Sequence, residues 1–137
     1  MNAQEVHPIR LYVMRLLYLL NFLFLGIDVW PSLVHHDGPW DPVKGVAFSF
    51  WAALSTLCAL GIRYPLKMVP VLLMQFLYKL IWLAAVAWPQ WATIRSHELT
   101  GVMWQGVIAD VIAIPWVYVW KAYVMQPGDR WRWSTRP

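Results

Sequence analysis

The sequence predicts an all-α integral membrane protein, a four-helix transmembrane bundle with both termini in the cytoplasm. Hydrophobic residues make up 60% of the 137 residues and charged residues only 13%, about half of the roughly 25% that is usual in soluble domains. In water, such a chain would expose more apolar surface than it could cover. The composition therefore excludes a soluble globular domain, a disordered chain and a nucleic-acid-binding module, and it makes the lipid bilayer the first partner of the protein.

Four apolar segments follow one another along the chain, each close to the roughly 20 residues that a spanning helix needs. We expect transmembrane helices at about 11–34, 43–62, 66–88 and 100–125, followed by a polar tail at 126–137. The stretches between them are HHDGPWDP, RYPLK and WPQWATIRSHE, which carry the Gly, Pro and polar residues that end helices. No shift in composition divides the chain, so residues 1–137 are predicted to form a single transmembrane domain.

Each segment has one face of polar or small residues, whereas its other faces are apolar. In the first, a polar stripe runs through Asn21 and Asp28 by 100° stepping. The second has a face of small residues, which allows another helix to approach closely; its members are Gly45, Ser49, Ala53 and Thr56. The third has a polar stripe that includes Gln75 and Tyr78, and the fourth has a face that includes Asp110. These faces predict a bundle with a polar seam.

Basic residues and tryptophans give the orientation. Eight of the eleven Lys and Arg residues belong to the side that holds both termini and the loop at 63–67, namely Arg10, Arg15, Arg63, Lys67, Lys121, Arg130, Arg132 and Arg136. The positive-inside rule then places both termini in the cytoplasm and the loops at 35–42 and 89–99 outside. Most of the eleven tryptophans fall near the ends of the segments, as expected for anchors at the membrane surface.

Two opposite charges lie deep within neighbouring segments. At 1.5 Å per residue, Lys79 lies about 18 Å into the membrane from Lys67, and Asp110 about 16 Å in from Lys121. A lone charge at mid-membrane costs about 2.5–3.5 kcal/mol, and pairing offsets that cost. We therefore predict an ion pair or hydrogen bond between Lys79 and Asp110, in a buried polar layer that also holds Asn21, Gln75 and Tyr78. This layer is either an ion or substrate site or a structural link between helices.

Polar residues on the outer side form a second group of interest. Asp28 and Gln105 are expected near the outer boundary. The outer loops combine imidazole and carboxylate groups, which suit zinc or copper(II); these residues are His35, His36, Asp37, His97 and Glu98. They do not follow the H-x3-H or HExxH spacing of metal sites, so solvated loops are the favoured interpretation.

Other motifs of enzyme chemistry are absent from the sequence. The single cysteine, Cys58, excludes an internal disulfide and a CxxC redox pair, and its apolar surroundings predict a small buried hydrophobe. The chain has no P-loop, no GxGxxG and no nucleophile elbow, and no His lies deep in an apolar segment. We therefore predict no catalytic residue and no cofactor.

A proline interrupts the fourth segment. Pro115 has no N–H to donate to the carbonyl of Val111, so we expect a kink at this point. Broken helices near the middle of the membrane recur in transporters. Proline is also common in ordinary membrane helices, and a simple kink is the preferred interpretation.

The second half of the chain resembles a group of uncharacterised small four-helix bacterial membrane proteins. The stretches that carry the resemblance are RYPLKMVPVLLMQFLYKLIWLAAVAWPQW and IPWVYVWKAYVMQPGDRW. The resemblance implies the bacterial inner membrane and brings no activity with it. Small multidrug-resistance transporters are also short four-helix proteins, but they carry an embedded Glu in the first helix. Here the first segment holds Arg15 and Asp28 but no Glu, and the deep acid is Asp110 in the last segment.

Three functions are consistent with these features. The leading one is a small non-enzymatic accessory, assembly or structural membrane subunit, which packs against itself or against a larger membrane-protein partner. The alternative is a small homo-oligomeric transporter or channel that uses the Lys79–Asp110 pair. A third is a membrane protein that binds metal on its outer face.

Overall fold

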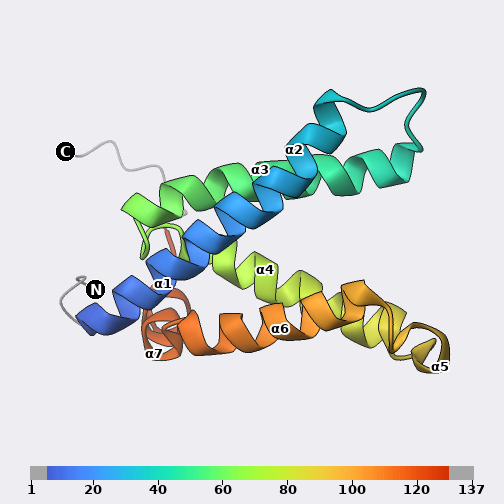
Figure 1. Ribbon diagram of the computed structural model, residues 1–137. Coiled ribbons are helices and arrows are strands. Elements are labelled where there is room, and N and C mark those ends of the chain that lie inside the picture. Colours follow the sequence, from blue (N-terminus) through green and yellow to red (C-terminus); the bar gives the residue numbers. More distant parts are fainter. Residues whose placement is uncertain (1–5, 130–137) are drawn as a thin grey trace.

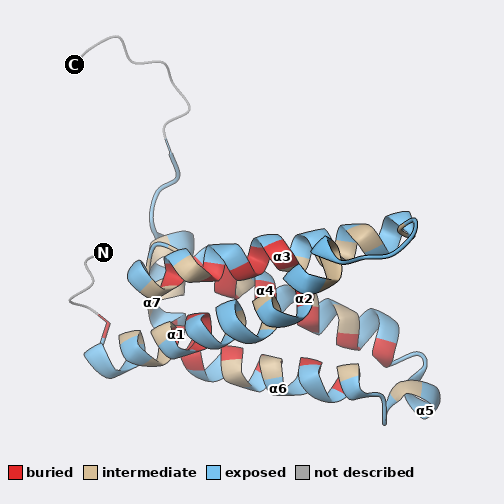
Figure 2. Ribbon diagram, turned by 45° about the horizontal axis from the view of Figure 1, so that its top comes forward, coloured by how far each residue is buried: buried red, intermediate tan, exposed pale blue. Residues whose placement is uncertain are grey.

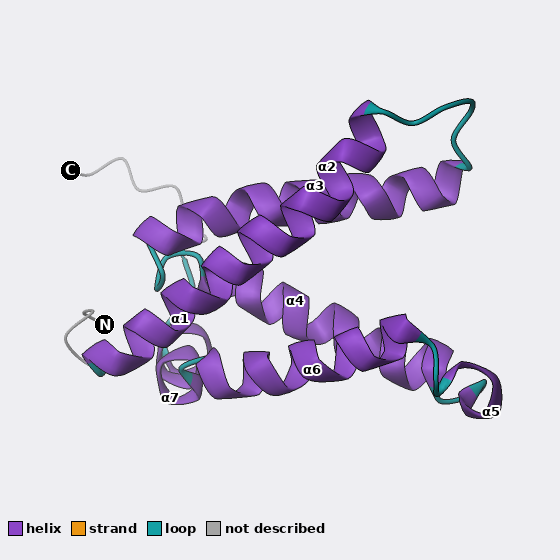
Figure 3. Ribbon diagram, in the orientation of Figure 1, coloured by secondary structure: helices purple, strands orange, loops and turns teal. Residues whose placement is uncertain are grey.

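The structure is a computed structural model that describes residues 6–129. Over this range the chain consists of helices and connecting loops without a strand (Figure 3), which confirms the predicted all-α class. Most of the predicted polar tail, including three arginines, lies outside the described residues; these are Arg130, Arg132 and Arg136.

The first two segments form a helical hairpin. Its elements are α1 (Pro8–Leu20), the π-helical turn η2 (Asn21–Leu25), α2 (Gly26–Val34) and α3 (Pro42–Arg63). The first three elements make one apolar helix of 27 residues, Pro8–Val34. Pro8 suits a first helical position because it has no N–H to leave unpaired. Asp41 directly precedes α3, and its carboxylate caps the helix by accepting a 2.8 Å hydrogen bond from the Lys44 N–H.

The two arms of this hairpin are joined by a polar contact at their crossing. The hydroxyl of Ser55 on α3 donates a 2.9 Å hydrogen bond to the carbonyl of Phe22 in η2. Gly26 provides the space for this contact, because a Cβ there would lie 2.8 Å from the Ser55 oxygen. Helix α3 therefore packs along the whole first arm, from α1 through η2 to α2.

The last two segments form a second hairpin. Its elements are α4 (Val69–Trp82), the π-helical turn η3 (Leu83–Ala87), the short α5 (Trp91–Ile94) and α6 (Glu98–Ala113). Helix α4 packs against α6, and a small apolar cluster joins η3 to α6; it consists of Leu83, Ala87, Met103 and Val107. The observed helices agree with the predicted segments except at the end of the fourth.

The fourth predicted segment, 100–125, is interrupted where Pro115 predicts a kink: the chain bends by 74° between α6 and the following elements α7 (Trp116–Val119) and η4 (Trp120–Met125), which is sharper than the simple kink expected from the sequence. Proline disfavours the helical conformation of the residue before it, and Ile114 is accordingly extended, with ψ of 126°. Residues 6–129 thus contain three helices long and apolar enough to cross a membrane, or four if the bent pair is one span.

The two hairpins meet at one end and diverge at the other (Figure 1). We call the first the joined end: α1 and α4 begin there, and α3 and α6 end there. The main apolar core lies on the joined side and includes Met14, Tyr18, Cys58, Leu72 and Ile114. The opposite end, which we call the open end, carries the loops at 35–41 and 88–97. Exposed residues cover the outer faces of the helices (Figure 2), and many of them are large apolar side chains that a bilayer would cover.

Candidate functional site

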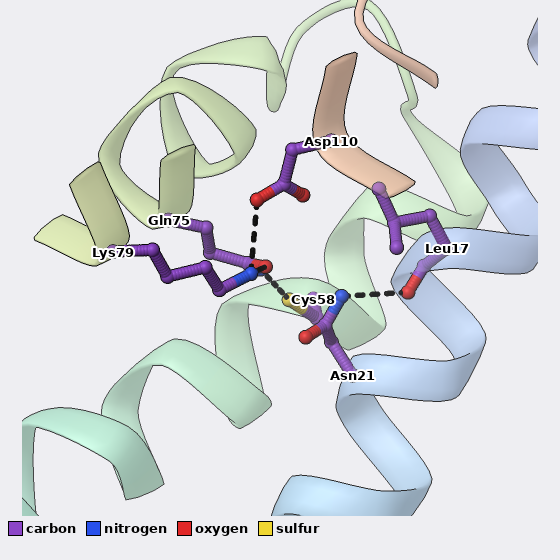
Figure 4. Close-up of polar contacts among 6 residues, drawn as sticks. All are labelled: Leu17, Asn21, Cys58, Gln75, Lys79 and Asp110. Atoms are coloured by element: carbon purple, nitrogen blue, oxygen red, sulfur yellow. Dashed lines mark hydrogen bonds and ion pairs between the residues drawn. The ribbon is translucent and has the colours of Figure 1, made fainter. Parts of the chain in front are cut away.

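A buried ion pair links the two helices of the second hairpin. Lys79 Nζ on α4 lies 2.9 Å from Asp110 Oδ2 on α6, and the two side chains are 9% and 0% exposed (Figure 4). The ion pair predicted from the sequence is therefore present in the structure. Two opposite charges in direct contact cancel much of the cost of removing each one from water.

The ion pair continues into a chain of polar contacts that reaches the first hairpin. The Lys79 ammonium also donates to Gln75 Oε1 at 3.4 Å, one turn earlier on the same face of α4. The amide Nε2 of Gln75 in turn donates to Cys58 Sγ on α3 at 3.2 Å. We call these four residues, Cys58, Gln75, Lys79 and Asp110, the polar chain. It connects three helices through side chains alone.

Glycine on the facing helix leaves room for the lysine side chain. A Cβ on Gly106 of α6 would lie 2.8 Å from Lys79 Nζ and 2.9 Å from its Cε. Gly106 precedes Asp110 by one helical turn, so the two residues share the face of α6 that meets α4. The ammonium thus lies against the backbone of α6 directly beside the carboxylate.

The position of Asp110 along its helix differs from the sequence estimate. The count for Asp110 began at Lys121 and assumed a straight helix, but α6 ends at Ala113 and the chain then bends. Asp110 is therefore only about 4.5 Å along the axis from the end of α6. Lys79 lies further from the start of α4, and its side chain is directed back toward that start, as helical side chains are. The polar chain consequently lies toward the joined end.

Two members of the predicted polar layer make their main contacts elsewhere. The amide of Asn21 donates to the carbonyl of Leu17 in its own helix at 2.9 Å (Figure 4). The ring of Tyr78 packs edge-on against Phe50 of α3, with ring centres 5.9 Å apart. The structure therefore brings Gln75 to the ion pair, whereas Asn21 and Tyr78 make no hydrogen bond to it within residues 6–129.

The second oxygen of the buried carboxylate is free. Within residues 6–129, Asp110 Oδ1 has no hydrogen-bond donor, although the side chain is fully buried. A buried acceptor without a partner costs free energy. Chemically, this oxygen could carry a proton or accept a hydrogen bond from a ligand.

The outer-side residues do not come together. Asp28 and Gln105 are exposed. His35, His36 and Asp37 lie at the tip of the first hairpin, whereas His97 and Glu98 lie at the start of α6 in the second, and the hairpins diverge at this end (Figure 1).

The part of the chain that the structure describes holds no group of three residues able to bind a metal ion. Instead, the His36 ring stacks on Trp40 at 3.6 Å, and His97 Nδ1 caps α6 by accepting from the Leu99 N–H. The metal group considered from the sequence is therefore not formed.

Two arginines have a role that the sequence did not reveal. Arg10 Nη1 donates to the carbonyls of Ile114 at 2.9 Å and Ile112 at 3.4 Å, and Arg15 Nε donates to the carbonyl of Ile62 at 3.1 Å. These carbonyls lie at the ends of α6 and α3, where a cation is favourable to the helix dipole. The charge count identified both arginines only as orientation signals, because no sequence pattern links them to helix ends that are far away in the chain.

The polar chain could either link helices or carry a proton or ligand. Its close packing favours the first role, since Lys79 fits against Gly106 and Asp110 is fully buried. No family model, curated protein or solved structure matches the chain. The choice between the two roles therefore depends on geometry and on experiment.

Proposed function

We propose that the protein is a small non-enzymatic subunit of the bacterial inner membrane, which assembles by packing α3 against a second copy of itself. In this proposal the two hairpins form a four-helix transmembrane bundle with the joined end and both termini in the cytoplasm. The distribution of basic residues supports this orientation, because Arg10, Arg15, Arg63 and Lys67 all lie at the joined end. The inner membrane follows from the sequence resemblance.

One observation carries the proposal: the small-residue face of α3 is left open. Ser49, Ala53 and Thr56 are exposed, and they line a groove of about 520 Å³ between α2 and α3. Trp30 and Leu33 of α2 form the other wall. Small residues on a transmembrane helix allow another backbone to approach closely, and this approach provides the van der Waals packing that associates helices in lipid. Within residues 6–129, Ser49, Ala53 and Thr56 remain exposed and so are open to another helix.

The chemistry of the face suits a second copy. Its larger exposed members are apolar, namely Val46, Leu57 and Leu60. The charged residues of α3, Lys44 and Arg63, lie at its two ends. Two copies related by a twofold axis would therefore bring identical uncharged surfaces together, which is the usual geometry of homodimers.

Disulfide cross-linking in membranes tests this interface. Ala53→Cys places a thiol at the centre of the face, and mild oxidation is expected to give a cross-linked dimer. Leu77→Cys is the matched control, because Leu77 lies in the middle of its own helix and is 54% exposed on the other hairpin. The native Cys58 is fully buried and should contribute little background. Equal cross-linking of the two variants, or none for Ala53→Cys, would contradict the proposal.

A second candidate function, a homo-oligomeric transporter or channel, is favoured by the unpartnered Asp110 Oδ1. A buried carboxyl oxygen without a donor could take up a proton or a cationic ligand during transport. Proton flux into proteoliposomes tests this function by comparing the wild type with Asp110→Asn and Lys79→Met. Proton flux with the wild type and no flux with either variant would establish the transport function. The absence of flux with the wild type would count against this function.

A further inference from the structure

A second cavity lies at the joined end, between the start of α1 and the bend after α6. Its volume is about 690 Å³, within the roughly 300–1,000 Å³ of small-molecule sites. His7 and Arg10 line it from α1, and Trp116, Tyr118 and Lys121 line it from α7 and η4. The cavity is separate from the polar chain and from the open face of α3.

The polar part of this cavity is cationic. Arg10 and Lys121 both line it, and no acidic residue of the described chain does. Arg10 uses Nη1 for the carbonyls at the end of α6, but its Nε and Nη2 have no acceptor within residues 6–129. Lys121 makes no hydrogen bond or ion pair with any described residue. A fixed guanidinium with unused N–H groups beside a second cation suits a phosphate group.

Histidine adds a further donor to the same wall. His7 Nδ1 accepts a 3.3 Å hydrogen bond from the Ile9 N–H and so caps α1. The neutral ring must then carry its proton on Nε2, and this Nε2–H is a further donor at the cavity, beside Arg10 and Lys121. Trp116 and Tyr118 add side chains that favour the boundary between lipid and water to this lining.

An apolar groove adjoins the cationic cavity. Its volume is about 310 Å³, and it shares His7 and Arg10 with the larger cavity. The rest of its lining is apolar: Ile9 and Val13 from α1, and Ile112 from α6. Ile9 and Val13 are one helical turn apart, so the groove follows α1 away from its start. A ligand that fills both spaces must have an anionic head and an apolar tail.

We propose that this pair of cavities binds an anionic phospholipid. Arg10 and Lys121 hold the phosphate, and one acyl chain lies in the groove along Ile9 and Val13. Basic pockets between helices at the cytoplasmic side of a membrane are suited to anionic headgroups. The inference does not depend on dimerisation through α3, because the two surfaces share no residue.

Native mass spectrometry in detergent tests the proposal by titration with dioleoylphosphatidylglycerol. Lys121→Gln is the variant of choice, because Lys121 is exposed and holds nothing in place, whereas Arg10 also caps α6. We expect its affinity for the lipid to fall about fivefold, the effect of one basic residue near an anionic surface. Lys67→Gln is the matched control, since Lys67 is an exposed lysine at the same end and lines neither cavity.

Two further ligands identify which part of the lipid is recognised. Dioleoylphosphatidylcholine has the same acyl chains without the net negative charge, and inorganic phosphate has the charge without the chains. Binding that is strong only for phosphatidylglycerol and weakened only by Lys121→Gln supports the proposal. Equal losses for Lys121→Gln and Lys67→Gln, equal binding of phosphatidylcholine, or displacement of the lipid by an equimolar amount of inorganic phosphate would overturn it.

Discussion

Gly106 of α6 and Lys79 of α4 fit one another: a Cβ on residue 106 would lie 2.8 Å from the lysine Nζ and 3.0 Å from its Cδ. A Cβ on residue 106 would therefore displace the end of the lysine side chain, which also makes the 2.9 Å contact with Asp110. The missing side chain on α6 and the charge on α4 are therefore parts of one arrangement. Glycine allows the cation to approach the α6 backbone and reach the carboxylate one turn further along.

Gly106→Ala is predicted to destabilise the protein. The added methyl group should push the Lys79 side chain out of position, at a cost of about 1–3 kcal/mol, as is typical of overpacking. Thermal unfolding of the purified protein in detergent measures the loss. Gly101→Ala is the control in the same helix, because a Cβ there meets nothing within 4 Å. We expect its midpoint to be unchanged or slightly raised, and an equal drop for both variants would show that the fit at Gly106 is unimportant.

Each charge of the Lys79–Asp110 ion pair is predicted to stabilise the protein only while the other is present. Lys79→Met leaves Asp110 as a buried carboxylate without a partner, and Asp110→Leu leaves the ammonium alone. Each single change is expected to cost about 3–5 kcal/mol. The double variant should recover much of this loss, because no isolated charge is left in the apolar interior.

The same thermal unfolding series also tests the alternative role of the pair. Suppose that Asp110→Leu alone is at least as stable as the wild type. The carboxylate would then be retained at a cost in stability, and the transport function would gain over the structural one. Leu77→Met, a change at an exposed position in the middle of α4, serves as a control for nonspecific effects of substitution.

The ion pair could be predicted from the sequence because its signal is local and strong. Lys79 and Asp110 are charges within long apolar segments that follow one another, and a lone charge in such a place is costly. Gln75 was predictable for a related reason, since it lies one turn from Lys79 on the same helix face. The position of the pair along the helices was not predictable, because the count from Lys121 required a straight helix through Pro115.

The direction of the bend after α6 depends on contacts that no local pattern encodes. Pro115 predicts a kink from its own chemistry, but the observed 74° bend brings Ile114 to Arg10, which is 104 positions earlier in the chain. The same holds for Cys58, which was predicted to be a buried hydrophobe. It is buried, and it also accepts a hydrogen bond from Gln75, because α3 and α4 are neighbours in space.

Tyr18→Phe is predicted to weaken the joined end of the fold. The buried hydroxyl of Tyr18 donates a 2.9 Å hydrogen bond to the carbonyl of Pro65, in the loop between the two hairpins. Its loss leaves that carbonyl without this donor and should cost about 0.5–1.5 kcal/mol. Tyr12→Phe in the same helix is the control, since Tyr12 is 69% exposed and its hydroxyl has no partner within residues 6–129. Identical unfolding midpoints for the two variants would be inconsistent with this role of the hydroxyl.

The last prediction concerns the carbonyl that proline leaves without a backbone donor. Trp116 Nε1 donates a 2.9 Å hydrogen bond to the carbonyl of Val111, the group to which residue 115 would donate in an unbroken helix. Trp116→Phe removes this donor and is expected to lower stability by about 0.5–1.5 kcal/mol. Trp120→Phe is the control, because Trp120 is exposed and its indole makes no hydrogen bond to the described chain.

A double-variant cycle with Pro115→Ala shows whether the indole acts through this carbonyl. Alanine restores an N–H at position 115, which can donate to Val111 in place of the indole. The cost of Trp116→Phe should therefore shrink in the Pro115→Ala background. If the cost is the same in both backgrounds, Trp116 stabilises the bend by packing alone, since its ring also lies 5.2 Å from that of Phe76. A smaller cost would show that an aromatic side chain takes over the hydrogen bond that proline removes, and that this exchange stabilises the sharp turn after α6.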